Sequence, residues 1–229
     1  MNIKIIRLES VDSTNNYAKE LRDKGEDVVV WAKRQTGGRG TKGRSFSSRE
    51  GGVYCSVLRF YQNRSANNAF QIMQSAAAAV CETLTAFGVQ PQIKWPNDIY
   101  VNGKKICGIL IENTFACGNV SSSIVGVGIN VHNVLEEELL PIATTLYRET
   151  GKKISVEEVA ERLIKHLFQE NMYEKYGEYL GWIGEEVTLI SGEENFRAIL
   201  LGVDEWGSVN VSIDGEKRRF AAAEITVRI

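Results

Sequence analysis

The sequence predicts an α+β fold, in which a mixed or antiparallel sheet with flanking helices is followed by a small β-barrel. Strand-like runs rich in β-branched and aromatic residues occur at 53–60 and 122–131, and an alanine-rich helix is expected between them at 66–87. After Gly184, short strands alternate with tight turns, which is typical of a small antiparallel barrel. A chain of 229 residues can hold one large and one small domain, which we place at 1–183 and 184–229.

The N-terminal segment predicts a strand followed by a helix. Residues 3–8 alternate between apolar and polar side chains, as a half-buried strand does. Asp12, Ser13 and Thr14 are all favourable N-cap residues, and they precede a helix expected to run to about Lys24.

Two further strands and a long helix complete the first half of the chain. The strands are expected at 28–32 and 53–60, on either side of a glycine-rich loop. The helix at 66–87 ends at Gly88, and its four consecutive alanines at 76–79 indicate close packing against the sheet.

A β-hairpin is the clearest local prediction in the middle of the chain. Residues 92–95 form a strand end that Pro96 interrupts. The next strands, 99–101 and 104–112, flank Asn102-Gly103, and Asn-Gly is the strongest two-residue hairpin signal.

The last helix and the C-terminal strands follow. Ser155 and Glu158 form a capping box that opens a helix expected to run to about Leu180. The strands predicted after it are 186–190, 196–203, 209–213, 218–222 and 225–229.

The composition limits the classes of function. A formal net charge of −2 gives no general electrostatic case for nucleic-acid binding. The four cysteines lack C-x-x-C spacing, and Cys55 and Cys107 lie in apolar runs, so we expect reduced cysteines and a cytoplasmic protein. The chain shows no signal peptide, no membrane-spanning run and no cluster of zinc ligands.

The loop at 35–46 holds four glycines and three cations, a composition suited to binding an anion such as phosphate. It contains G-x-G-x-x-G and resembles a P-loop, but both patterns require a helix directly afterwards, and here a strand follows. A kinase glycine loop does join two strands, but the chain has no H-R-D or D-F-G motif. The loop is therefore either a different anion-binding loop or a solvated surface turn.

Three further clusters are candidates for a site, and each also has an ordinary structural explanation. Lys94-Trp95-Pro96-Asn97-Asp98 could address a cation or a ribose, or could be a simple turn. Lys105 points from a buried strand, where an ammonium needs an anion, whereas Lys104 is expected only to keep the hairpin soluble. The glycines of 126–130 indicate close approach by a ligand or by backbone.

Together these clusters resemble those of the biotin protein ligases, within the wider biotin/lipoate ligase superfamily. The resemblance covers nearly the whole chain, and Lys-Trp-Pro-Asn-Asp followed by Gly-Lys-Lys-x-x-Gly-Ile-Leu is its most specific part. The matches in chain order are Ser13-Thr14-Asn15, Gln35, Gly38-Arg39-Gly40 through Gly43-Arg44, Lys94–Asp98, Lys105 with Gly108-Ile109-Leu110, Gly128-Ile129-Asn130, and 224–228.

The resemblance implies a class II synthetase-like catalytic domain, an SH3-like C-terminal barrel and a two-step reaction. Biotin and MgATP give biotinyl-5′-AMP, which then acylates a lysine of the biotin carboxyl carrier domain of a carboxylase. Catalytic roles are implied for Lys105, Arg39 and Arg44. Biotin binding is implied for Ser13, Thr14, Asn15, Gln35, Gly38, Arg39, Gly40, Thr41, Lys105 and Gly108. ATP and Mg²⁺ binding is implied for Arg44, Phe46, Lys94, Asn97, Asp98 and Asn130, with Asp98 as the metal ligand.

Other functions stay open beside this one. A lipoate or octanoate ligase or transferase of the same superfamily is the alternative enzyme, and a non-catalytic biotin-binding module is the alternative class. Some relatives carry a helix-turn-helix domain, but here the first catalytic strand begins at Ile3, so we expect no specific DNA binding. We expect no membrane partner. A homodimer is plausible because edge strands can pair across chains.

Thr41 stands where the family commonly has a second arginine directly after Gly-Arg-Gly, and Phe46 stands where it often has tryptophan. The missing arginine helps to hold the adenylate, so we predict that Thr41→Arg slows the release of biotinyl-5′-AMP. The measurement is the dissociation rate of the adenylate from both proteins, and equal rates would refute the prediction.

Overall fold

A computed structural model describes residues 3–192, 194–222 and 224–229. Its larger sheet has seven strands in the order β1-β2-β3-β7-β6-β5-β4. Only β1 and β2 run parallel and the other neighbours are antiparallel, so the predicted mixed sheet is confirmed. The strands are β1 (Lys4–Val11), β2 (Val28–Gln35), β3 (Gly52–Ser65), β4 (Gln92–Lys94), β5 (Asp98–Val101), β6 (Lys104–Ala116) and β7 (Asn119–Asn130).

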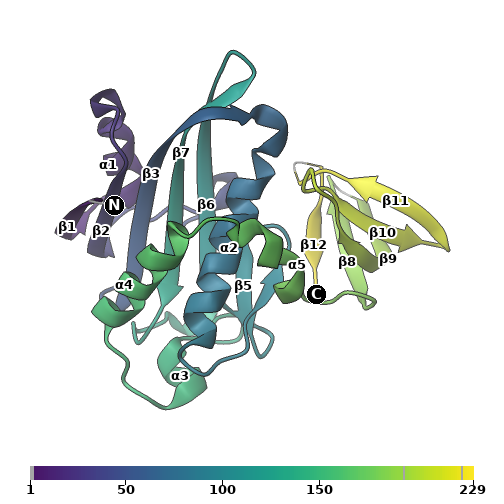
Figure 1. Ribbon diagram of the computed structural model, residues 1–229. Helices are drawn as coiled ribbons and strands as arrows, with labels where there is room; N and C mark the ends of the chain where they lie inside the picture. The colour runs from purple at the N-terminus through teal and green to yellow at the C-terminus, as the bar shows by residue number, and fades with distance from the viewer. Residues whose placement is uncertain (1–2, 193, 223) are drawn as a thin grey trace.

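Helices cover the two faces of this sheet unequally. The long helix α2 (Phe70–Thr85) and α4 (Val156–Leu167) lie across one face (Figure 1). Ala76 and Ala77 pack in the core against the sheet as predicted, whereas Ala78 and Ala79 pack against Met172 instead. The short helix α1 (Thr14–Glu20) packs on the other face.

Successive side chains of β2 pack alternately on the two faces of the sheet. Val29 and Trp31 join the core beneath α2 and α4, whereas Val28 and Val30 pack with Ala18 of α1. Because α1 covers only one corner of its face, the strands β5, β6 and β7 leave room there for a cavity.

The helix expected from Ser155 to about Leu180 is shorter than predicted. The predicted Ser155 N-cap is present, since its hydroxyl accepts a hydrogen bond from the Glu158 N–H at 3.3 Å, but α4 ends at Leu167. Asn171 then takes a left-handed conformation, with φ of 58°, which asparagine tolerates better than most residues. The chain turns there into a 3₁₀ turn (Met172–Lys175) and α5 (Tyr176–Tyr179).

Packing explains this turn. Met172 is buried against Ala78 and Ala79 of α2, and Tyr176 joins the main core. Core packing therefore outweighs continued helix formation. A short helix that the sequence analysis missed, α3 (Leu146–Thr150), begins at a Thr145 cap and ends at Gly151, which has φ of 69°.

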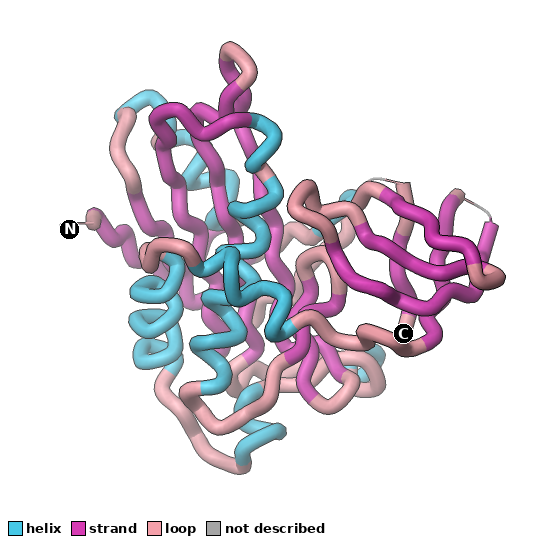
Figure 2. Tube along the Cα trace, turned by 45° about the vertical axis from the view of Figure 1, so that its right-hand side comes forward, coloured by secondary structure: helices cyan, strands magenta, loops and turns pink. Residues whose placement is uncertain are grey.

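The strands predicted after Gly184 form a second, five-stranded antiparallel sheet in the order β11-β10-β9-β8-β12. Figure 2 shows these strands as a separate group beside the larger sheet. They are β8 (Glu186–Ser191), β9 (Glu194–Val203), β10 (Val209–Ile213), β11 (Glu216–Phe220) and β12 (Thr226–Arg228). In the described ranges, no helix is long and apolar enough to cross a membrane.

Trp95 joins the two sheets. Its side chain is 3% exposed in the core of the C-terminal sheet, and its indole N–H donates to the Gly207 carbonyl at 3.0 Å. Phe70, at the start of α2, packs against both cores. The small sheet therefore holds the segment that precedes Asn97 and Asp98. The division at 183/184 stays a prediction.

Gly207 has no room for a side chain. It has φ of 87°, and a Cβ there would overlap the Phe70 ring. We predict that Gly207→Ala lowers the free energy of unfolding by about 3 kcal/mol, from backbone strain plus overpacking. Urea denaturation followed by tryptophan fluorescence measures the loss.

Gly215→Ala is the matched control, since Gly215 has φ of 84° but no neighbouring atom lies within 4 Å of the position that a Cβ would take. It carries the backbone strain alone, about 1 kcal/mol. Equal losses of unfolding free energy in the two variants would contradict the close packing of Gly207 against Phe70.

Candidate active site

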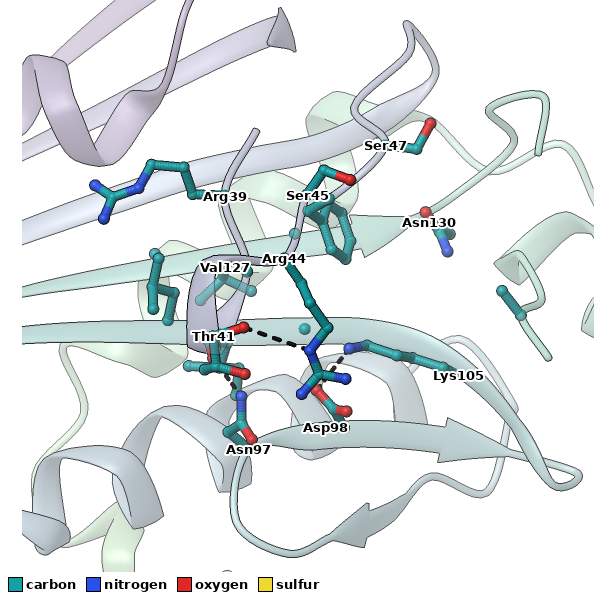
Figure 3. Close-up of a pocket in the computed structure, with 18 of the residues that line it drawn as sticks. Arg39, Thr41, Arg44, Ser45, Ser47, Asn97, Asp98, Lys105, Val127 and Asn130 are labelled. Carbon is teal, nitrogen blue, oxygen red and sulfur yellow. Dashed lines mark hydrogen bonds and ion pairs between the residues drawn. The ribbon is translucent and has the colours of Figure 1, made fainter. Parts of the chain in front are cut away.

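A cavity of about 340 Å³ lies against β5, β6 and β7 beneath the glycine-rich loop (Figure 3). Every predicted site residue except Gly38 lines it, although these residues are spread from 13 to 130 in the sequence. Gly38 instead closes the loop, because its carbonyl accepts a hydrogen bond from the Phe46 N–H at 2.9 Å. The structure thus brings the predicted residues together, while their individual binding roles stay predictions.

Glycines on β7 create the floor of the cavity. Val125, Val127 and Ile129 pack in the core on the helix side, so Gly126 and Gly128 face the other way. A Cβ on Gly126 would overlap the Asn15 amide, and one on Gly128 would overlap the Phe46 ring. The glycines therefore permit the close approach that the sequence indicated.

A bulge turns Lys105 into the cavity. Asp98 pairs with Gly108, and Tyr100 pairs with Lys105, so β6 has one more residue than β5 between these pairs. In a regular strand Lys105 and Gly108 would face opposite sides, because their spacing is odd. The extra residue puts both on the cavity side, where a Cβ on Gly108 would lie 3.3 Å from the Lys105 ammonium.

One end of the cavity is cationic. The Lys105 ammonium lies 2.6 Å from an Asp98 carboxylate oxygen, and the Arg44 side chain points toward this pair (Figure 3). Lys94 also lines this end. Burial lowers the pKa of Lys94, the charges of Lys105, Arg44 and Arg228 lower it further, and Asp98 opposes them.

Asp98 alone supplies a carboxylate among the described residues that line the cavity, and no described carboxylate pairs with Arg44. The cationic end therefore carries excess positive charge and suits a polyanion. Arg228, for which the sequence left open a solvated position or a role at the site, is exposed on β12 but close enough to act on Lys94.

The other end of the cavity is a slot of buried polar groups. Ser13, Thr14 and Asn15 are at most 4% exposed. The Gln35 carbonyl oxygen accepts hydrogen bonds from the Thr14 N–H at 2.8 Å and the Thr14 hydroxyl at 3.0 Å. The Ser56 hydroxyl, which the sequence analysis missed, lies 2.6 Å from the Asn15 carbonyl oxygen. Such a slot can hold a small polar ring whose donors and acceptors all need partners.

Arg39 lies apart from the other two predicted catalytic residues. Its guanidinium points away from Lys105 and Arg44 (Figure 3), donates to Asn16 at 3.0 Å and lies 3.4 Å from Glu112. Glu112 was missed, although its even spacing from Gly108 on β6 indicates that it faces the same side of the sheet.

Asn97 and Asn130 use their amides to fix the neighbouring backbone. The Asn97 amide donates to the Ile109 carbonyl at 2.8 Å, and the Asn130 amide donates to the Thr144 carbonyl at 3.1 Å. Both side chains still line the cavity. In the part of the chain that the structure describes, no group of three or more histidine, cysteine or acidic side chains could hold a metal by itself.

Phe46 and a second group of apolar side chains also line the cavity. The Phe46 ring lies against Gly108 and Gly128, with its centroid 6.0 Å from the Lys105 ammonium. A cluster that the sequence analysis missed, Leu135, Leu139, Ile142 and Ala143, also lines the cavity. Its flat apolar surface could hold an aromatic base.

Residues 8–130, more than half of the chain, match the biotin/lipoate A/B protein ligase family. The chain therefore belongs to this family of enzymes.

Several relatives within this family are named as biotin ligases. The chain is 32% identical to the bifunctional ligase/repressor BirA of Bacillus subtilis, over 96% of this chain and 73% of that protein. It is 28% identical to the biotin–[acetyl-CoA-carboxylase] ligase of Paracoccus denitrificans, over 95% and 98% of the two chains. The biotin protein ligase of Aquifex aeolicus, solved with biotin and ATP, superposes with a TM-score of 0.78 at 31% identity and 98% coverage of both chains.

The charge distribution predicts how the cavity binds a simple polyanion. Arg44→Gln should weaken the binding of inorganic pyrophosphate about ten-fold, because an unpaired guanidinium is lost from the cationic end. Arg39→Gln is the matched control and should weaken it much less, since Arg39 already faces Glu112. Isothermal titration calorimetry in EDTA measures both, and equal losses would contradict this assignment of the two arginines.

Proposed function

We propose that the protein is a biotin protein ligase, which activates biotin with ATP to biotinyl-5′-AMP and transfers the biotin to a carrier lysine. One observation carries the proposal: a single cavity joins a polar slot to a cationic end that contains Lys105. A vitamin with a polar ring at one end and a carboxylate at the other fits this order of groups. The similarity to ligases solved with biotin and ATP supports the same conclusion.

The first step brings two anions together. A biotin carboxylate oxygen forms a bond to the α-phosphorus of ATP, and the bond from that phosphorus to the bridging oxygen of pyrophosphate breaks. Lys105 would lie between the carboxylate and the α-phosphate, and Arg44 and Lys94 would face the departing phosphates. Cations held in place by the fold offset this repulsion without reorganising.

Asp98 keeps Lys105 ready for this step. Without a partner, an ammonium on an inner strand would be costly. The pair at 2.6 Å neutralises Lys105 until anionic substrates arrive. The bound anions would then share the ammonium with Asp98.

The polar slot would hold the ureido ring of biotin. Ser13, Thr14, Asn15 and Gln35 offer both donors and acceptors there, as the N–H and C=O groups of a buried ureido ring require. Gly38, Gly40 and Thr41 would let the loop pass over the ligand, and Gly108 would leave space beside its carboxylate.

The nucleotide would occupy the cationic end and the neighbouring apolar surface. Asn97 and Asn130 line this region, and Phe46 borders it. A Mg²⁺ ion at this end would take one carboxylate oxygen from Asp98. The phosphates of ATP would supply further oxygen ligands. Bound there, Mg²⁺ would neutralise phosphate charge.

The second step needs little from the protein beyond positioning. A neutral carrier lysine attacks the carbonyl carbon of the mixed anhydride, the bond to AMP breaks, and the new amide nitrogen loses a proton. The anhydride is already reactive, so orientation of the amine would provide most of the acceleration.

The partner is a biotin carboxyl carrier domain of a biotin-dependent carboxylase. Cytoplasmic location, the absence of specific DNA binding and a homodimer through edge strands stay predictions.

The test is the intact mass of a carrier domain incubated with the protein, MgATP and biotin, lipoate or octanoate in separate reactions. We expect the carrier to gain the mass of one biotinyl group, which is biotin less one water, and no mass from the other two acids. Lys105→Ala should lower pyrophosphate release at least about 100-fold, the loss typical of a key electrostatic group.

Lys104→Ala is the matched control. Lys104 is the adjacent lysine, but it donates to the Leu140 carbonyl at 3.1 Å outside the cavity, so the variant should keep most of the activity. Transfer of lipoate or octanoate would favour the alternative enzyme. Tight biotin binding with no pyrophosphate release would favour a non-catalytic binding module.

A further inference from the structure

We propose that Glu112 is a positioning residue that prepares the slot to bind biotin, by fixing Asn15 on one side and Arg39 on the other. This inference rests on the proposed function for the identity of the ligand. Glu112 does not itself line the cavity, but both of its partners do.

Glu112 divides its carboxylate between these partners. One oxygen accepts a hydrogen bond from the Asn15 amide at 2.9 Å, and the other lies 3.4 Å from the Arg39 guanidinium. The side chain is 24% exposed, so solvent screens these contacts less than it screens surface pairs.

The carboxylate determines which way the Asn15 amide points. A carboxylate only accepts hydrogen bonds, so Asn15 must turn its NH₂ group toward Glu112. Its carbonyl oxygen then receives the Ser56 hydroxyl at 2.6 Å. Because the two ends of an amide are interchangeable in shape, this chain of contacts gives the slot one definite pattern of donors and acceptors.

Through Arg39, Glu112 also fixes the position of the glycine-rich loop. The loop segment 39–45 forms its own small hairpin, in which the Gly40 N–H donates to the Arg44 carbonyl at 2.7 Å. The Arg39 side chain reaches from this hairpin to Glu112 and Asn16 on the body of the protein. Glu112 therefore holds both the glycine-rich loop, through Arg39, and the polar slot, through Asn15.

Glu112→Gln tests the proposal with almost no change of shape. A glutamine can accept from Asn15 or from Arg39 with its one carbonyl oxygen, but it turns its NH₂ group toward the other partner. We expect biotin binding without ATP to weaken about ten-fold, with the KM for biotin rising equally. The kcat at saturating biotin and the KM for ATP should change less than about three-fold, because Lys105 and Arg44 are untouched.

Glu82→Gln is the matched control. Glu82 is 27% exposed and accepts from Lys175 at 2.7 Å and from Tyr179 at 2.9 Å, but it lies on α2, across the sheet from the slot. This variant should keep the biotin affinity of the unmodified protein. If both substitutions weakened biotin binding equally, the effect would come from a general loss of stability when an ion pair is removed. The proposal would then fail.

Trypsin gives a readout that does not depend on biotin. Without ligands, cleavage after Arg44 should be at least about three-fold faster in Glu112→Gln than in the unmodified protein or in Glu82→Gln. If Glu112→Gln binds biotin and resists trypsin like the unmodified protein, the proposal is overturned. If the unmodified protein binds no biotin, the proposed function fails, and the trypsin rates still decide whether Glu112 holds the loop.

Discussion

The candidate site depends on one ion pair, between Lys105 on β6 and Asp98 on β5. An ammonium on an inner strand needs a partner, because an unpaired charge away from water is destabilising. Asp98 supplies that partner at 2.6 Å, and the bulge in β6 provides the turn that lets the two side chains meet. The remaining cations can then gather at the same end without a second carboxylate among the described lining residues.

The two arginines of the glycine-rich loop differ in whether a carboxylate balances their charge. Arg39 is balanced by Glu112, whereas Arg44 faces the cavity without a described carboxylate. Two arginines only five positions apart therefore present different charges to a ligand. The polar slot is nearly neutral and the opposite end is positive, which orders a ligand that is neutral at one end and anionic at the other.

The sequence was sufficient for the strands, the long helix and the hairpin, and every predicted site residue except Gly38 lines the cavity. Those features follow from local patterns, such as Asn102-Gly103 and the alanines of α2. The end of α4 at Leu167 did not follow, because burial of Met172 against α2 is a long-range effect. The inward turn of Lys105 also could not be read from strand alternation, since one inserted residue reverses the alternation. Glu112 was overlooked because its two partners, Asn15 and Arg39, are distant in the sequence.

The position of Arg228 affects where an affinity tag can be attached. It stands next to Ile229, on the strand that closes the small sheet, and its charge reaches Lys94 in the cavity. An acidic affinity tag fused at this terminus would bring carboxylates near the cationic end of the cavity. The first strand, β1, lies at the edge of the larger sheet opposite β4, away from the small sheet (Figure 1), so purification handles are better attached before it.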